Sequence, residues 1–308
     1  MDSLGSPWVG QDEGGMRRSI GKQAARAIGA AIAAIAAVAT GLSLAASARA
    51  DEQLFAFTRG AETLPQGRSE AYQFVTLRTG KKSGTYYGLD FDTELEHGFT
   101  DRLQASLALV NRYFSIEDVE ELPDTDAYRF GGVESSAKYR ILSPFKDPVG
   151  LAFRLEGGYL RHDEVGGLNE NEWFIAPEID LQKNFRDDTI NLDMNLGSEW
   201  AWGKQPAEQY PRELSLQGAT GIAYRFASNW FIGAETRVRS EFPLFDLSNF
   251  EHTVVYAGPS LHYGAQRWWA TVSWLYQVYG KGVDEDNPGI TFAEETRQMV
   301  RLKFGWNF

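Results

Sequence analysis

The sequence predicts an all-β protein, a single transmembrane antiparallel up-and-down β-barrel of about twelve strands. Three observations lead to this prediction. Apolar and polar residues alternate along long segments, short and long connections alternate between these segments, and aromatic residues gather near both ends of them. Alternation with a period of two is typical of a strand, because successive side chains of a strand point to opposite faces of the sheet.

The alternation is clearest in residues 294–308. One parity carries the apolar residues Val300, Leu302, Phe304, Trp306 and Phe308. The other parity carries Arg297, Arg301 and Lys303. Helical spacing would scatter these charges around the element, whereas strand spacing places them all on one face.

The same pattern predicts a barrel over residues 68–308. The expected strands are 68–78, 84–97, 102–113, 127–141, 149–162, 171–184, 188–202, 212–226, 229–241, 252–264, 266–279 and 294–308. They are longer than the five or six residues usual in soluble sheets, as expected of segments that cross a bilayer.

The connections between these segments sort by length. Tight turns are expected at residues 99–101, 185–187, 227–229 and 265–266, and long polar links at 115–126, 163–170, 203–211, 242–251 and 280–293. Short and long connections alternate along the chain. Transmembrane barrels have short periplasmic turns at one rim and long extracellular loops at the other, and a soluble sandwich has no reason to sort its loops in this way.

Aromatic residues form two expected belts. Near the short-turn rim lie Phe145, Phe185, Tyr224, Phe226, Trp230, Tyr263, Trp268 and Trp306, and near the long-loop rim lie Tyr87, Tyr113, Tyr159, Trp173, Trp200, Trp202 and Tyr276. Such belts are typical of the two water–lipid interfaces of a membrane barrel. A large soluble barrel is the less favoured alternative.

Composition excludes several functions. The 308 residues carry a net charge of -12, which argues against a nucleic-acid partner because phosphate binding needs an excess of Lys and Arg. The chain has no cysteine, so it has no disulfide, no thiol nucleophile and no cysteine-based zinc site. No cofactor is expected. No metal site is expected either, because His97 and His162 fall on separate predicted strands and at different rims from one another, and His252 and His262 fall at opposite ends of a third.

Residues 1–50 are expected to hold an N-terminal extension and a cleavable secretory signal peptide. Basic residues between Arg17 and Arg26 precede an apolar run at 27–46, and Ala48-Arg49-Ala50 forms a small-residue cleavage site. An uncleaved membrane anchor is the alternative. Export and a barrel together predict the outer membrane of a Gram-negative cell. Residues 51–67 are expected either in the periplasm or folded into the lumen as a plug.

The two ends of the expected mature chain carry a resemblance. Phe304, Trp306 and the terminal Phe308 resemble the signal that outer-membrane barrels present to the barrel assembly machinery. The run from Leu54 to Pro65 resembles the opening of a porin-like family of uncharacterised predicted outer-membrane barrels, a domain-of-unknown-function family. The resemblance implies location and architecture, with outer-membrane lipid and lipopolysaccharide as surroundings, and it implies no substrate.

The polar parity of the strands predicts a charged lumen. Acidic candidates are Asp90, Asp92, Glu94, Glu96, Glu178, Asp180 and Asp193, and basic candidates are Arg225, Arg237, Arg239, Arg267, Arg297, Arg301 and Lys303. One interpretation is a transverse field across a pore. The other is that the charges pair across the lumen and fill it, because unpaired buried charge is costly. The facing of strand 68–78 stays open, since its aromatic and charged residues share one parity.

The predicted function is a passive channel for small polar or charged solutes, without enzymatic activity. A non-conducting barrel with a structural or surface-interaction role is the first alternative. The second is a barrel-embedded lipid hydrolase that would use Ser260 and His262, which share a strand face. Their order does not match the His-x-Ser pattern of outer-membrane phospholipases, and they face the predicted lumen rather than the lipid.

Overall fold

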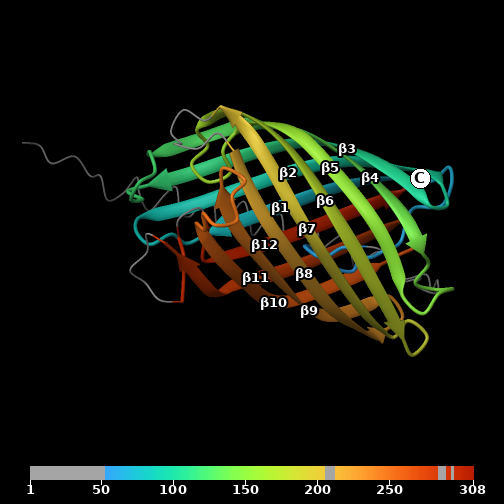
Figure 1. The fold of residues 1–308 in the computed structure, drawn as a ribbon. Coiled ribbons are helices and arrows are strands. Elements are labelled where there is room, and N and C mark those ends of the chain that lie inside the picture. Colours follow the sequence, from blue (N-terminus) through green and yellow to red (C-terminus); the bar gives the residue numbers. More distant parts are fainter. Residues whose placement is uncertain (1–52, 205–211, 284–288, 293–294) are drawn as a thin grey trace, which may run out of the picture. The chain divides into compact units, whose positions relative to one another are not determined.

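The computed structural model describes residues 53–308 except 205–211, 284–288 and 293–294. Twelve strands form one closed barrel in which every strand pairs antiparallel with its neighbours in sequence and β1 pairs with β12 (Figure 1). The strands are β1 Ser69–Thr79, β2 Thr85–Thr100, β3 Leu103–Glu117, β4 Thr125–Leu142, β5 Gly150–His162, β6 Asn169–Phe185, β7 Ile190–Lys204, β8 Arg212–Ala227, β9 Trp230–Pro243, β10 His252–Gly264, β11 Trp268–Gly282 and β12 Gln298–Asn307. In the described part of the chain, no helix is long and apolar enough to cross a bilayer.

The predicted barrel and its strand number are confirmed. The expected signal peptide at 1–50 lies outside the described residues. The twelfth strand begins at Gln298 rather than at 294, because the preceding residues turn into the barrel: Thr296 is buried and its carbonyl accepts a hydrogen bond from the Tyr256 hydroxyl at 2.5 Å. The closing strands are tied by two reciprocal backbone bonds between Ser69 and Phe308, at 3.1 and 2.9 Å.

Short connections predominate at the end of the barrel where β1 begins and β12 ends, called here the terminal end, although the β4–β5 connection there spans residues 143–149. The β8–β9 turn occupies residues 228–229 and the β2–β3 turn 101–102. Thr100 shapes the latter, since its hydroxyl oxygen accepts hydrogen bonds from the amides of Arg102 and Leu103. At the opposite end, called here the loop end, the β3–β4, β5–β6, β9–β10 and β11–β12 connections are longer.

The two faces of the sheet differ as the alternation predicts. Leu95 and Leu107, which are register partners on β2 and β3, are 57% and 55% exposed on the outer face. Asp90 and Ser273 point inward and are buried. An outer face of exposed apolar side chains suits contact with hydrocarbon, where alternation along a strand separates lipid-facing from lumen-facing residues.

Strand β1 points its aromatic and charged residues to the inside. Tyr72, Glu70 and Arg78 are all buried, and the Tyr72 hydroxyl donates to Glu70 at 2.9 Å and to Glu96 at 2.5 Å. The mixed parity of this strand therefore reflects an inner face that itself contains aromatic rings.

Aromatic side chains cluster at both ends of the outer face. At the terminal end the ring of Tyr263 lies 4.7 Å from Trp230 and 5.0 Å from Trp268. At the loop end Tyr159 and Trp173 pack with their ring centroids 4.8 Å apart. These rings occupy the positions where membrane barrels carry their interfacial girdles.

Candidate functional site in the barrel lumen

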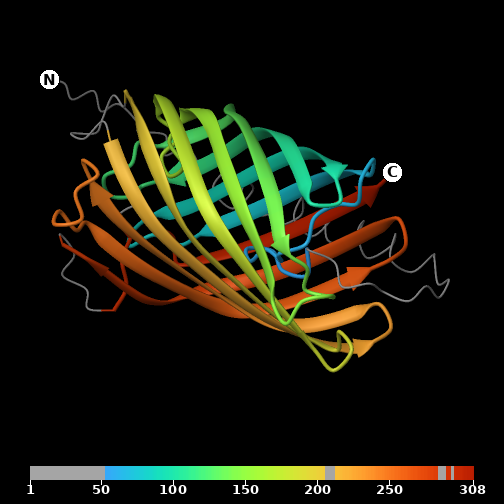
Figure 2. The ribbon, with the colours of Figure 1, turned by 45° about the vertical axis from the view of Figure 1, so that its right-hand side comes forward.

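Residues 53–66, called here the lumenal segment, run inside the barrel (Figure 2). Its apolar side chains are buried against the inner wall in two clusters. Leu54 and Phe55 pack on Ala223 and Phe231, and Ala56 and Phe57 pack on a group formed by Val254, Tyr256, Leu275 and Met299. The lumen of the described barrel thus holds apolar surface on both the wall and the segment.

Glu235 on β9 is the main anchor of the lumenal segment. Its carboxylate accepts hydrogen bonds from three successive backbone amides, those of Ala56, Phe57 and Thr58, at 3.0, 2.8 and 3.0 Å. The Ser273 hydroxyl on β11 also donates to it. Buried backbone amides need acceptors, and a carboxylate with two oxygens can satisfy several of them at once.

Further strands hold the rest of the segment through its backbone. Asn195 on β7 accepts from the Arg59 amide at 2.7 Å and donates to the Arg59 carbonyl at 2.9 Å. The remaining backbone contacts are Gln182 with the Ala61 amide at 2.8 Å, Gln104 with the Leu64 amide at 2.6 Å, and Lys138 with the Gly60 carbonyl at 2.6 Å. These polar wall residues therefore fix the position of the segment's main chain through hydrogen bonds.

Two glycines in the wall leave room for a side chain of the segment. A Cβ atom on Gly221 of β8 would lie 2.8 Å from the Phe55 ring, and one on Gly233 of β9 would lie 3.2 Å from it. Glycine in a strand often marks close approach of another group to the backbone. Here two neighbouring strands lack side chains where the Phe55 ring packs.

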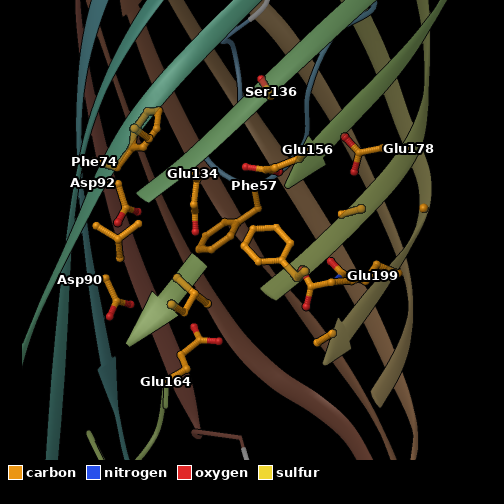
Figure 3. A pocket seen from close by; sticks show the side chains of 18 of the residues that line it. Phe57, Phe74, Asp90, Asp92, Glu134, Ser136, Glu156, Glu164, Glu178 and Glu199 are labelled. Carbon is orange, nitrogen blue, oxygen red and sulfur yellow. The ribbon is translucent and has the colours of Figure 1, made fainter. Parts of the chain in front are cut away.

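A cavity of about 630 Å³ lies beside the lumenal segment. Phe57 and Arg59 of the segment line one end, and Glu121 and Glu164 of the β3–β4 and β5–β6 connections line the other. Side chains from the strands between point into it (Figure 3). Among the described lining residues are fourteen Asp or Glu and eight Lys or Arg, so carboxyl groups outnumber cations.

Many of these charges are paired. Asp90 lies 2.8 Å from Arg78 and 3.7 Å from Arg112, and the Arg154 guanidinium donates to Glu156 at 2.6 Å. Arg239 lies among four carboxylates, those of Glu164 at 4.0 Å, Glu199 at 3.8 Å, Glu213 at 3.7 Å and Glu241 at 2.6 Å. Pairing of this kind lowers the cost of holding charge inside a barrel.

Other acidic and basic side chains that line the cavity form no ion pair within the described residues. Within the described residues, Asp92, Glu134 and Arg237 make no side-chain hydrogen bond and no ion pair, although all three line the cavity (Figure 3 labels the two acids). Arg301 donates to Thr76 at 2.7 Å and its guanidinium lies 4.4 Å from the centre of the Phe57 ring. The cavity therefore presents charge that is available to a solute.

The mouth of the cavity is narrowed by connections that fold inward. Tyr86, Phe114, Ile116 and Val119 form a buried apolar cluster, against which Leu122 and Val165 pack. The Tyr86 hydroxyl donates to the Val165 carbonyl at 2.8 Å. The Glu164 side chain is half exposed at this mouth, and Arg78, Arg112, Arg239 and Arg237 outweigh its partial desolvation and lower its pKa to about 2.

The sequence-predicted lumen residues separate into three groups. Nine line the cavity: Asp90, Asp92, Glu94, Glu96, Glu178, Arg237, Arg239, Arg301 and Lys303. Asp180 and Asp193 are buried inside the barrel and do not line the cavity. Asp180 instead accepts a hydrogen bond from Asn195 at 2.7 Å and lies 3.7 Å from Lys138, both of which hold the lumenal segment.

Three further predicted lumen residues do not line the cavity. Arg267 is exposed in the turn between β10 and β11. Arg297 precedes β12 at the loop end, and its guanidinium stacks on the ring of Tyr276, an outward-facing residue, at 4.4 Å. Arg225 donates to the Asp187 carbonyl at the terminal end, beyond the cavity. At the rims, strand alternation no longer determines where a long side chain goes.

The cavity is also lined by charged residues that were not among the predicted lumen residues. Among them are Arg59, Arg112, Glu134, Lys138, Arg154 and Glu156. The five that lie on strands share the parity of buried neighbours on β3, β4 and β5, so the same alternation rule could have found them. Arg59 comes from the lumenal segment, which has no such period.

The proposed hydrolase pair lies beneath the lumenal segment. Ser260 and His262 are both buried and neither lines the cavity. The His262 Nδ1 atom lies 2.7 Å from the Thr271 hydroxyl, and that hydroxyl donates to the Gln53 carbonyl at 2.8 Å. A lipid would have to displace the segment to reach them, so their surroundings suit a structural role.

The chain matches one protein family and is similar in fold to solved outer-membrane barrels. The family of unknown function DUF6662 matches residues 47–308. No curated protein sequence matches the chain. Among solved structures, the COG4313 outer membrane channel from Pseudomonas putida F1 superposes with a TM-score of 0.56 at 13% identity, over 80% of this chain and 98% of that one.

Two further structures are similar at lower scores. The NanC porin gives a TM-score of 0.47 at 11% identity over 77% of this chain and 98% of its own. LpxR from Salmonella typhimurium gives 0.45 at 9% identity over 77% of this chain and 99% of its own. At such identities the likeness extends to the fold alone, which is that of outer-membrane barrels.

Proposed function

The chain belongs to the DUF6662 family of unknown function, and we propose that it is a passive outer-membrane channel for small polar solutes with a preference for cations. The observation that carries this proposal is the cavity inside the closed barrel, whose lining has more carboxyl groups than cationic groups. A pore lined by one excess sign of charge concentrates ions of the other sign.

The size and lining of the cavity support a small solute. Its volume of about 630 Å³ falls within the range of small-molecule sites. Asp92 and Glu134 offer carboxylates without a described partner, and Phe57 and Phe74 add apolar surface beside them. A small cation could exchange part of its hydration shell for these carboxylates.

The lumenal segment makes the proposed path narrow. It runs beside the cavity and reaches the terminal end, where the Gln66 amide donates to Asp101 in the β2–β3 turn at 3.0 Å. A solute that crosses must pass beside this segment or move it. We therefore expect a low conductance rather than that of a wide, water-filled porin.

The test is the reversal potential of the refolded chain in a planar bilayer under a KCl gradient. We expect cation selectivity. The double substitution Asp92→Asn with Glu134→Gln should reduce it, and the matched change Arg237→Gln with Arg301→Gln should increase it. The two double variants remove opposite charges from one cavity, so each serves as the control for the other. Anion selectivity, or identical reversal potentials in all three proteins, would contradict the proposal.

A second candidate is a closed barrel with a structural or surface-interaction role. It is favoured by the lumenal segment itself, whose backbone is hydrogen-bonded to Glu235, Asn195 and Gln182. A chain that inserts stably but gives no reproducible open level would favour this candidate. Recognition of Phe304, Trp306 and Phe308 by the barrel assembly machinery, and contact with lipopolysaccharide, belong to both candidates.

A further inference from the structure

Four titratable side chains meet at the loop end of β9 and β10, and none of them lines the cavity described above. Glu241 and His252 are register partners on these two strands, and Glu251 immediately precedes His252. The Glu251 amide donates to the Glu241 carbonyl at 3.0 Å, which fixes the start of β10. Glu295, from the connection before β12, approaches the other side of His252.

The imidazole ring of His252 is buried between carboxylate groups. The side chain is completely buried, and neither ring nitrogen makes a hydrogen bond within the described residues. Its Nδ1 atom lies 3.5 Å from a Glu241 oxygen and its Nε2 atom 3.8 Å from a Glu295 oxygen. Both distances exceed the length of a hydrogen bond, and buried polar atoms without partners are rare in proteins.

These separations match those between ligands of one metal ion. Ligand atoms of Glu241, Glu251 and His252 all lie within 4.8 Å of one another. Two ligands at about 2.0 Å from a tetrahedral ion are about 3.3 Å apart, close to the 3.5 Å between His252 and Glu241. We propose that Glu241, Glu251 and His252 form a binding site for a divalent cation of the zinc type.

Arg239 orients the carboxylate of Glu241. Its Nε atom lies 2.6 Å from Glu241 Oε1, while the other carboxylate oxygen, Oε2, is the one that faces His252. Metal-binding carboxylates are commonly oriented by such outer contacts. Arg239 thereby leaves one oxygen of Glu241 directed at the site.

The donor set selects the class of ion. One imidazole and two carboxylates suit zinc and similar transition metals, whereas calcium prefers six to eight oxygen ligands. No metal site was expected from the sequence because its histidines are not clustered, and the proposed site contains only one histidine.

The test is isothermal titration of the full chain, refolded in detergent and freed of metal with a chelator, with ZnCl2 and separately with CaCl2. We expect one zinc ion per chain and at least tenfold weaker binding in His252→Gln. The Glu251→Gln variant should also weaken binding, and it keeps the proposal testable if the change at His252 prevents folding. His97→Gln is the matched control, since His97 lies at the terminal end and contacts Ser69.

A second measurement reports on the ligands directly. Cobalt(II) bound to the wild-type chain should give a visible d–d absorption that is lost or shifted in His252→Gln and unchanged in His97→Gln. Absence of saturable zinc binding would overturn the proposal, as would zinc binding that neither His252→Gln nor Glu251→Gln weakens. Binding of calcium in preference to zinc would also overturn it.

Discussion

The carboxylate of Glu235 accepts a hydrogen bond at 2.8 Å from the backbone amide of Phe57, a residue 178 positions earlier in the chain. Glu235 is buried on the inner face of β9, and Phe57 lies within the lumenal segment. The contact joins the barrel wall to the lumenal segment, and both of these parts line the cavity. Four predictions concern these parts and the membrane face around them.

Substitution of Glu235 should release the lumenal segment. Glu235→Ala leaves three buried backbone amides without their acceptor, and each unsatisfied donor costs about 1–3 kcal/mol. Arg59 would then become accessible to trypsin. Mass spectrometry of the digested, membrane-embedded chain should show cleavage after Arg59 in the variant and protection in the wild type. Glu134→Gln is the control, because Glu134 lines the cavity and makes no hydrogen bond or ion pair to the segment in the described structure. Equal protection in all three proteins would contradict this role of Glu235.

A methyl group on β8 should displace Phe55. The Cβ atom of Gly221→Ala would lie 2.8 Å from the ring, an overlap expected to cost about 1–3 kcal/mol. Combined with Phe55→Ala, the same change should cost less than the two single changes added together, with a coupling of about 1 kcal/mol or more. Rates of cleavage after Arg59 in the two single variants and the double variant measure this coupling. Strict additivity would show that the ring does not pack on Gly221.

A charge on the outer face should destabilise the barrel in lipid. Leu107 lies between the two aromatic belts on β3 and is 55% exposed. Leu107→Arg should cost about 2–4 kcal/mol, the penalty for arginine near the bilayer midplane. Reversible denaturant unfolding in lipid vesicles gives the difference from Leu107→Ala, which keeps the position apolar. If the arginine variant were as stable as the alanine variant, Leu107 would not face hydrocarbon.

Acid should loosen the mouth of the cavity through Glu164. Its pKa in the folded chain is about 2, below the ordinary value of 4.5, because nearby arginines outweigh the partial desolvation of this half-exposed side chain. A depressed pKa stabilises the folded state above the ordinary value, and that stabilisation is lost as the pH falls from about 4.5 to about 2. Hydrogen exchange in residues 163–168, corrected for the intrinsic rate, should therefore increase across this window.

The corresponding control is Glu164→Gln. This variant cannot titrate at that position, so exchange in the β5–β6 connection should depend less on pH between about 4.5 and 2. The same pH dependence in both proteins would mean that another group controls the connection.

Much of the barrel wall follows from local sequence. The alternation of residues such as Asp90 and Asp92 with Leu89 and Phe91 is visible within one strand, because lipid and lumen impose opposite demands on neighbouring positions. For the same reason nine of the predicted lumen residues line the cavity. Local alternation does not extend to the rims, where Arg267 sits in a turn and Arg297 stacks on an outer aromatic ring.

The contents of the lumen could not be predicted in this way. The run Leu54–Phe57 has no period, and its partners lie on strands more than a hundred residues later in the chain. Its position depends on complementary features such as Gly221 and Glu235, which read as ordinary strand residues in the sequence. The meeting of Glu241 with His252 likewise depends on the register between β9 and β10.

The most direct test of the central claim is the single-channel conductance of the wild-type chain and of Glu235→Ala in planar bilayers. If the barrel is a channel narrowed by the lumenal segment, the wild type should show a small open level and the variant a clearly larger one, because the released segment no longer occupies the lumen. Absence of any reproducible open level in both proteins would contradict the account.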